Sequence, residues 1–370
     1  MIYGKDAQRN GIVSYPGTYY MFSHTINDVN NRQDASTIPG SIFAVYELGF
    51  ALVTSTIIAA SVQGRVNMTG FLVFISIWHI VIYTPVAHIV WNYNGAFKTN
   101  YVTDFAGGMV VHMLAGATSL SLHVVLGKDT IPKAGPVADP EKALYLAFLV
   151  WFLWFGFNSG KSHDASQVAA QSIVNTIAAG MISVLTAFFY HLIFERVITS
   201  VTIVYALLIG LIAITPAAGY VTIGGAMCIS LSTYLITAYV SNFFTNEGNF
   251  TNEPFSILTI HSVAGTVGFI WTTIISYNFV NPKANNGLTH GQGMPLAYHL
   301  ATACAFWGTT LVATFILAFI SNLIAPMGET GSDYSYKAGS PAEAVEKGDN
   351  YKSAEDASKE KEGGLELTSV

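Results

Sequence analysis

Long apolar runs separated by short polar connections dominate this chain between residues 41 and 325. An α-helix needs roughly 20 apolar residues to cross a hydrocarbon core of about 30 Å, and most of the runs approach that length. The connections are rich in Gly, Asn, Asp and Pro, which are typical of turns. The pattern predicts nine membrane-spanning helices: Ile42–Val62, Thr69–Val90, Asp104–Leu126, Ala143–Phe157, Val168–Phe194, Thr199–Ile214, Thr222–Val240, Pro254–Tyr277 and Tyr298–Ile324.

The composition agrees with an all-α integral membrane protein. Hydrophobic residues make up 52% of the chain and charged residues only 10%, whereas soluble domains carry about 25% charged residues. Ten acidic residues and five lysines follow Pro326, so the tail holds most of the formal charge of −6. The rest of the chain is nearly neutral and has no basic patch that would indicate nucleic-acid binding.

Three regions follow from this pattern. Residues 1–40 form an N-terminal segment that we expect to be extracellular, residues 41–325 form the transmembrane domain, and residues 326–370 form an acidic cytoplasmic tail that we expect to be disordered. A weak excess of Lys and Arg in the connections on the tail side supports this orientation. The chain ends in Thr368-Ser369-Val370, a short pattern that PDZ domains can bind.

Two histidines lie deep inside expected helices. His112 is about 12 Å below Asp104 along its helix, and His261 is roughly two turns into another. Ionisable groups at this depth are costly, so each indicates a functional site. Glycines flank both histidines and would allow another helix to approach closely. The pair could face one central site, as in transporters built from inverted repeats, or be buried core histidines, or bind a haem between them.

No other set of residues indicates enzymatic chemistry. We find no nucleophile and base in a known motif, no phosphate-binding loop and no zinc spacing, so we expect neither an enzyme nor a bound metal or cofactor. The two cysteines, Cys228 and Cys304, lie in apolar runs and are interpreted as small core residues.

The run from Asp104 to His112 is similar to the signature of the ammonium transporter family (Amt/Mep/Rh). Further ordered segments also resemble that family, and together they extend from about Ser41 to Ile324: Pro85–Trp91, Trp154–Asn158, Thr215–Tyr220 with Gly224–Ala226, and His261–Gly268. The resemblance implies a helical bundle with inverted repeats, a homotrimer and the plasma membrane. The family has eleven spans, so the resemblance also implies that the first two helices are missing here.

The resemblance assigns roles along one path through the bundle. The implied roles are outer recruitment of the cation for Trp91 and Tyr46, a gate for Phe50 and Phe157, a structural role at the vestibule for Asp104, and the pore and proton relay for His112 and His261. The implied function is ammonium or ammonia transport and nitrogen uptake, with deprotonation of ammonium at the outer aromatic site. The alternatives are a truncated non-conducting relative, an ammonium-sensing receptor and, more remotely, a haem-binding membrane protein.

Two residues near the expected outer site, Lys161 and Glu47, depart from the family pattern. Lys161 lies where the family usually has a small hydroxyl residue, and its charge there would repel a cation. Either Ser162 takes the place of that hydroxyl, or the Lys161 side chain extends away toward water. Glu47 replaces a glutamine and is either an ordinary interface residue or an added attraction for cations.

Overall fold

All nine expected helices are present in the computed structural model, which describes residues 11–13, 37–63, 65–97, 101–127, 139–195, 197–246 and 257–328. Eight helical stretches among them are long and apolar enough to cross a membrane, and the ninth is a shorter apolar helix, Ser200–Ile214. The all-α prediction is therefore confirmed. The expected acidic tail beyond residue 328, its terminal Thr368–Val370 pattern and most of the N-terminal segment lie outside the described residues.

Several membrane-spanning stretches combine two kinds of helical turn. In chain order the elements are α1 (Gly40–Val62), α2 (Met68–Trp78), η3 (His79–Tyr83), α3 (Thr84–Trp91), η4 (Gly108–Met113), α4 (Leu114–Leu126), α5 (Pro140–Ser159), η6 (Gly160–Ser162), α6 (Gln167–Tyr190), η7 (His191–Glu195), α7 (Ser200–Ile214), α8 (Ile223–Asn246), η8 (Leu258–Val263), α9 (Ala264–Ile275), η9 (Leu288–His290) and α10 (Met294–Ile324). The elements η3, η4, η7 and η8 are π-helical turns, in which the backbone is wider than in an α-helix.

Polar side chains at several helix starts explain where these helices begin. The Asn67 side chain accepts a hydrogen bond from the backbone N–H of Gly70, and Asp139 does the same for Lys142. Such caps satisfy backbone donors that the first helical turn leaves without partners. Because Asp139 caps it and Pro140 fits its first position, α5 begins three residues before the predicted Ala143.

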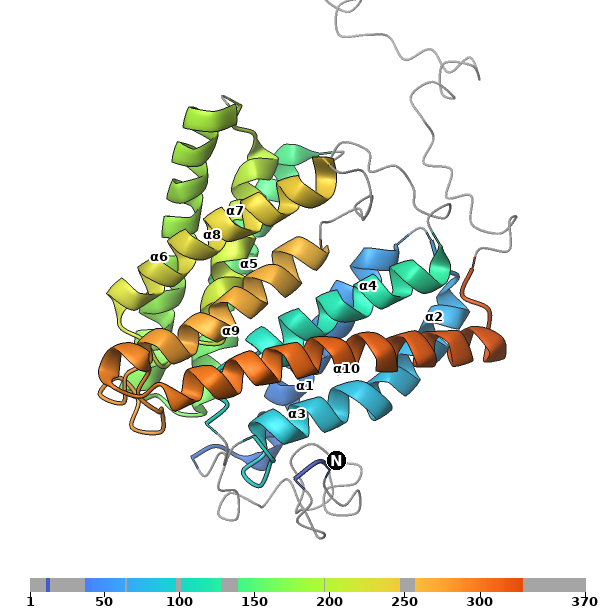
Figure 1. Ribbon diagram of the computed structural model, residues 1–370, viewed down its shortest axis with the longest axis horizontal. Coiled ribbons are helices and arrows are strands. Elements are labelled where there is room, and N and C mark those ends of the chain that lie inside the picture. Colours follow the sequence, from blue (N-terminus) through green and yellow to red (C-terminus); the bar gives the residue numbers. More distant parts are fainter. Residues whose placement is uncertain are drawn as a thin grey trace, which may run out of the picture. The chain divides into compact units, whose positions relative to one another are not determined.

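The helices form two groups that meet at α9. Helices α6 and α7 pack against each other and against both α5 and α8, while α10 packs against α2, α4 and α9, and α1 packs against α4. Figure 1 shows the first group in green and yellow and the long α10 helix, in orange and red, running past α4. Helix α9 contacts both groups, and its π-helical start, η8, contacts η4. This arrangement brings together two turns that are far apart in the sequence.

A buried irregular segment, Thr215–Val221, separates α7 from α8. Helix α7 has only 15 residues and extends about 22 Å, less than the hydrocarbon thickness, so this segment lies where unpaired backbone groups would be costly. Its carbonyl groups have partners from outside the segment. The Asn175 side chain donates to the carbonyls of Ala218 and Val221, each at 2.8 Å, and Phe105 N–H donates to the Pro216 carbonyl at 3.0 Å.

Small residues allow α4 and the η8–α9 stretch to approach closely. A Cβ atom added at Gly116 would overlap the Ser262 side chain, and one added at Gly265 would lie 2.8 Å from the carbonyl oxygen of Gly108. The Ser262 hydroxyl donates to the carbonyl oxygen of Met113 at 3.1 Å. Only glycine permits this separation at Gly116, as expected for a small-residue contact between membrane helices.

Candidate functional site

His112 and His261 are in direct contact at the centre of the bundle. His112 lies in η4 and His261 in η8, so each comes from a π-helical turn. Their Nδ1 atoms are 3.1 Å apart, and the ring centroids are 5.3 Å apart. A hydrogen bond at this distance needs one ring to donate and the other to accept. The contact leaves no space for a macrocycle between these two rings, so a haem ligated by this pair is incompatible with the geometry.

The surroundings of the pair are apolar and aromatic. The Trp154 ring stacks on His112, with centroids 5.6 Å apart and an interplanar angle of 11°. The Trp154 indole donates to the Thr215 hydroxyl at 3.1 Å, which links this ring to the irregular segment. His112 is fully buried, and its Nε2 atom has no hydrogen-bond partner in the described part of the chain. The hydrogen-bonding capacity of that nitrogen is therefore unused inside the bundle.

The Asp104 carboxylate holds the start of η4. Its Oδ1 accepts hydrogen bonds from the backbone N–H groups of Gly107 and Gly108, and its Oδ2 accepts from those of Met109 and Val110, at 2.7–3.0 Å. Gly107 adopts a φ of 106°, which favours glycine, and turns the chain into the helix. Residues 104–107 thus precede the helix, and the predicted start at Asp104 was four residues early.

Four aromatic side chains form a cluster of ring contacts next to Asp104. Phe50 and Phe157 are in contact, with centroids 4.5 Å apart, and the Trp91 ring is 5.3 Å from Phe50. The Trp91 indole donates to the backbone carbonyl oxygen of Asp104 at 2.8 Å. The Tyr46 hydroxyl donates to the carbonyl oxygen of Phe157 at 2.6 Å. The structure therefore brings together the aromatic residues that the sequence predicts at the outer site and gate.

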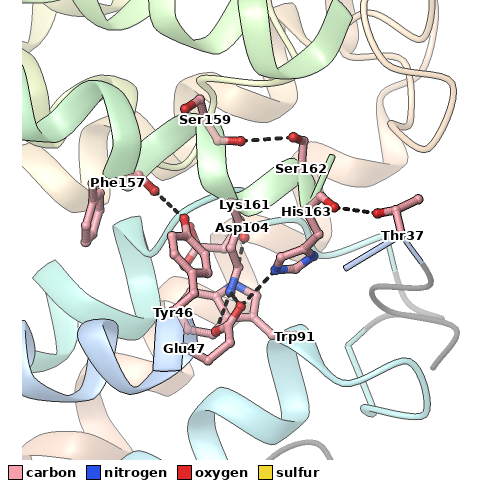
Figure 2. Close-up of polar contacts among 10 residues, drawn as sticks. All are labelled: Thr37, Tyr46, Glu47, Trp91, Asp104, Phe157, Ser159, Lys161, Ser162 and His163. Carbon is pink, nitrogen blue, oxygen red and sulfur yellow. Dashed lines mark hydrogen bonds and ion pairs between the residues drawn. The ribbon is translucent and has the colours of Figure 1, made fainter. Parts of the chain in front are cut away.

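A buried cluster of charged and polar groups lies beside these rings. The Lys161 ammonium group is 2.7 Å and 2.8 Å from the two carboxylate oxygens of Glu47, and His163 Nε2 is 3.1 Å from one of them. Figure 2 shows the contacts of Lys161 and His163 with the Glu47 carboxylate, close to the Trp91 side chain. We call the region formed by Tyr46, Glu47, Trp91, Lys161 and His163 the mouth.

The sequence left open whether Ser162 takes the place of the family's hydroxyl or Lys161 extends toward water, and the structure shows a third arrangement. Lys161 does not extend to water: its side chain is only 6% exposed, and its nitrogen is 3.4 Å from the centroid of the Trp91 ring. The Ser162 hydroxyl bonds to the carbonyl oxygens of Ser159 and Asp164, within its own turn. Glu47 is likewise no ordinary interface residue, since it is buried and paired. The sequence contains no signal that pairs residues 47 and 161.

The described residues include no group of three His, Cys, Asp or Glu side chains that could hold a metal ion. The interpretation of Cys228 and Cys304 as core residues was wrong, because both are exposed, on α8 and α10. An apolar residue of a membrane-spanning helix can face lipid as readily as the protein core, and the hydrophobic pattern alone does not distinguish the two.

A model of the Ammonium Transporter Family matches residues 1–330 of the chain. The chain belongs to the ammonium transporter family. It is 31% identical over 313 residues to an ammonium transporter of Bacillus subtilis, covering 81% of this chain and 74% of that relative. It is also 28% identical to the ammonium transporter MEP2 of Saccharomyces cerevisiae over 342 residues, 88% of this chain and 66% of the yeast protein.

Solved structures of this family share the fold. The crystal structure of Saccharomyces cerevisiae Mep2 superimposes with a TM-score of 0.73 at 26% identity, covering 82% of this chain and 72% of that one. Candida albicans Mep2 gives a TM-score of 0.74 at 26% identity, with coverage of 80% and 68%. Together with the eight apolar helices, these matches show that this family member is an integral, multi-pass membrane protein.

Proposed function

We propose that this protein transports ammonium nitrogen across a membrane along a path that passes Phe50 and Phe157 and then His112 and His261. The observation that carries the proposal is the direct contact between two buried histidines, with Nδ1 atoms 3.1 Å apart, from helices that are distant in sequence. Membership of the ammonium transporter family supports ammonium as the substrate. The homotrimer stays a prediction from the resemblance.

An apolar path cannot accept a bare cation, because burying an unpaired charge is prohibitive. Ammonium can leave a proton at the mouth and continue as neutral ammonia, whereas potassium cannot. The aromatic contact between Phe50 and Phe157 separates the charged mouth from the histidines, so deprotonation belongs on the mouth side of that contact. This explains how an ammonium path could exclude metal cations of similar size.

The histidine pair suits a small neutral molecule. When one neutral imidazole donates from Nδ1, its Nε2 is an acceptor, while the ring that accepts at Nδ1 carries its proton on Nε2 and is a donor. The pair therefore offers one acceptor and one donor, which match the N–H groups and the lone pair of ammonia. A shared proton between the rings also provides a step for proton transfer.

The test is uptake of ammonium and methylammonium by cells that lack their own ammonium transporters. We expect uptake by the wild-type protein, and loss of uptake or of potassium exclusion in the double variant His112→Ala/His261→Ala. His290→Ala is the control, because His290 is exposed on the connection before α10. If the double variant transports ammonium and excludes potassium as the wild type does, the proposed role of the histidines is wrong.

A second candidate is a non-conducting relative, which includes an ammonium-sensing receptor. The observation that favours it is the position of Lys161, whose ammonium group lies against the aromatic rings of the mouth. Absence of uptake by a wild-type protein that is folded and present in the membrane would support this candidate over transport.

A further inference from the structure

The Lys161 ammonium group has the contacts expected of a bound cation. Its nitrogen is 3.4 Å from the centroid of the Trp91 ring and 4.6 Å from that of Phe50. Both carboxylate oxygens of Glu47 lie within 2.8 Å of it. The exposed fractions of the two charged side chains are 6% and 5%, so the pair is largely shielded from water.

Aromatic faces together with a carboxylate attract small cations. A lysine head group is a protonated primary amine with three N–H donors, and it differs from methylammonium only in the chain attached to its carbon. The protein therefore holds an amine of the same chemical class as the proposed substrate against the Trp91 and Phe50 rings. This amine is attached covalently through the lysine side chain. The family resemblance assigns cation recruitment to Trp91 and the gate to Phe50.

We propose that Lys161 is a built-in occupant of the outer cation site, and that the site formed by Glu47, Trp91 and Phe50 binds a free small protonated amine only when the lysine head group is absent or displaced. The proposal relies on the proposed function only in treating the mouth as the entrance for ammonium. Lys161 thus excludes free cations from the site, because a second cation at the same position would meet a like charge at very short range.

In the part of the chain that the structure describes, two other ionisable side chains contact this cluster, and neither supplies a second carboxylate. Tyr46 uses its hydroxyl to donate to the Phe157 carbonyl, and His163 contacts the same Glu47 carboxylate from the connection after α5. Glu47 is therefore the carboxylate that pairs with the bound cation in the mouth. Binding of a cation in the mouth should therefore depend on the negative charge of Glu47.

Chemical rescue tests this proposal. Lys161→Ala removes the stem and the ammonium group, which leaves room at the rings and takes a partner from Glu47. The melting temperature is measured in detergent by tryptophan fluorescence, and we expect it to be lower for this variant than for the wild type. Methylammonium or ammonium chloride should raise the melting temperature of the variant, and this increase should saturate with concentration. Choline chloride at equal ionic strength should not produce that rise, because its head group is larger and has no N–H donors.

Two variants provide the controls. Glu47→Gln/Lys161→Ala lacks both charges and should show no saturable rise with methylammonium. Lys283→Ala removes an exposed lysine whose charge helps to lower the pKa of the Asp164 carboxyl group. This variant should respond to methylammonium as the wild type does. Rescue of Lys161→Ala that is at least fivefold larger than the wild-type response and depends on Glu47 would support the proposal.

Equal responses of Lys161→Ala, the wild type and the double variant would overturn the proposal and leave Lys161 as a structural ion pair. If Lys161→Ala folds only when it is produced with methylammonium, that dependence is itself rescue. If it fails to fold with or without methylammonium while the double variant folds, the proposal is wrong. The readout requires no transport, so an absence of wild-type uptake would refute the proposed function without affecting this result.

Discussion

Replacing Asp104 by asparagine tests whether the carboxylate holds the start of η4 by accepting four backbone hydrogen bonds. The substitution keeps the size of the side chain but replaces one oxygen with an NH2 group. If the remaining oxygen keeps Gly107 and Gly108 as donors, the NH2 group faces the N–H groups of Met109 and Val110, which then lose their acceptor.

The magnitude follows from those two lost bonds. A hydrogen bond to a charged group contributes about 1.5–3 kcal/mol, so losing two costs about 3–6 kcal/mol. Neutralising a buried carboxylate also recovers part of the free energy spent on removing its charge from water. We therefore expect Asp104→Asn to lower the free energy of unfolding by about 3 kcal/mol, at the lower end of that range.

Equilibrium unfolding in mixed micelles, followed by tryptophan fluorescence, measures this loss. The matched control is Asp164→Asn, because Asp164 is exposed in the connection after α5, where its carboxylate accepts a bond of 3.3 Å from the backbone N–H of Ser166 and water can replace a lost partner. We expect a change of less than about 0.5 kcal/mol for the control. If Asp104→Asn is as stable as the control, the carboxylate does not hold the start of η4 as an ionised cap.

Three further predictions use the same unfolding measurement. Gly116→Ala should destabilise the protein by about 1–3 kcal/mol, because its Cβ would overlap Ser262, and adding Ser262→Gly should recover part of that loss. The control is Gly308→Ala, where the added atom meets nothing within 4 Å. Equal stability of Gly116→Ala and Gly308→Ala would contradict the close approach of the helices at Gly116. Asn175→Ala should cost about 1–3 kcal/mol by removing the donor for two carbonyls of the segment between α7 and α8, and an unchanged value would show that water replaces the amide. Glu47→Gln should cost about 3–5 kcal/mol because it breaks a buried ion pair, and a loss below about 1 kcal/mol would show that water screens the pair.

The positions of the helices could be predicted because their apolar runs are long and the connections between them carry turn residues. The ends of individual helices could not, because they depend on single contacts such as the Asp139 cap on α5. The buried course of Thr215–Val221 was also not predicted. Its backbone partners, Asn175 and Phe105, come from distant parts of the chain, and no local pattern indicates such pairing.

The aromatic and histidine positions of the site could be proposed from ordered motifs, since each motif keeps its residues in a local register. The direction of the Lys161 side chain could not be predicted from a motif. Its four-carbon stem can reach water or the protein interior from the same backbone position, and its partner, Glu47, lies 114 residues away. The direction of the side chain is therefore decided by tertiary packing, and only the structure shows it among the rings of the mouth.

The π-helical turns η4 and η8 affect how this chain tolerates insertions and deletions. Each wide turn accommodates one residue more than an α-helical turn would, and both histidines lie within such turns. Deleting a single residue from η4 would restore a regular α-helix with little rotation of α4 relative to the start of η4, because an α-helical turn with one residue fewer covers nearly the same angle. Gly116 would then keep its contact with the η8–α9 stretch, whereas the turn that carries His112 would become narrower. A one-residue deletion in η4 should therefore disturb the contact between the two histidines while the packing of α4 is retained.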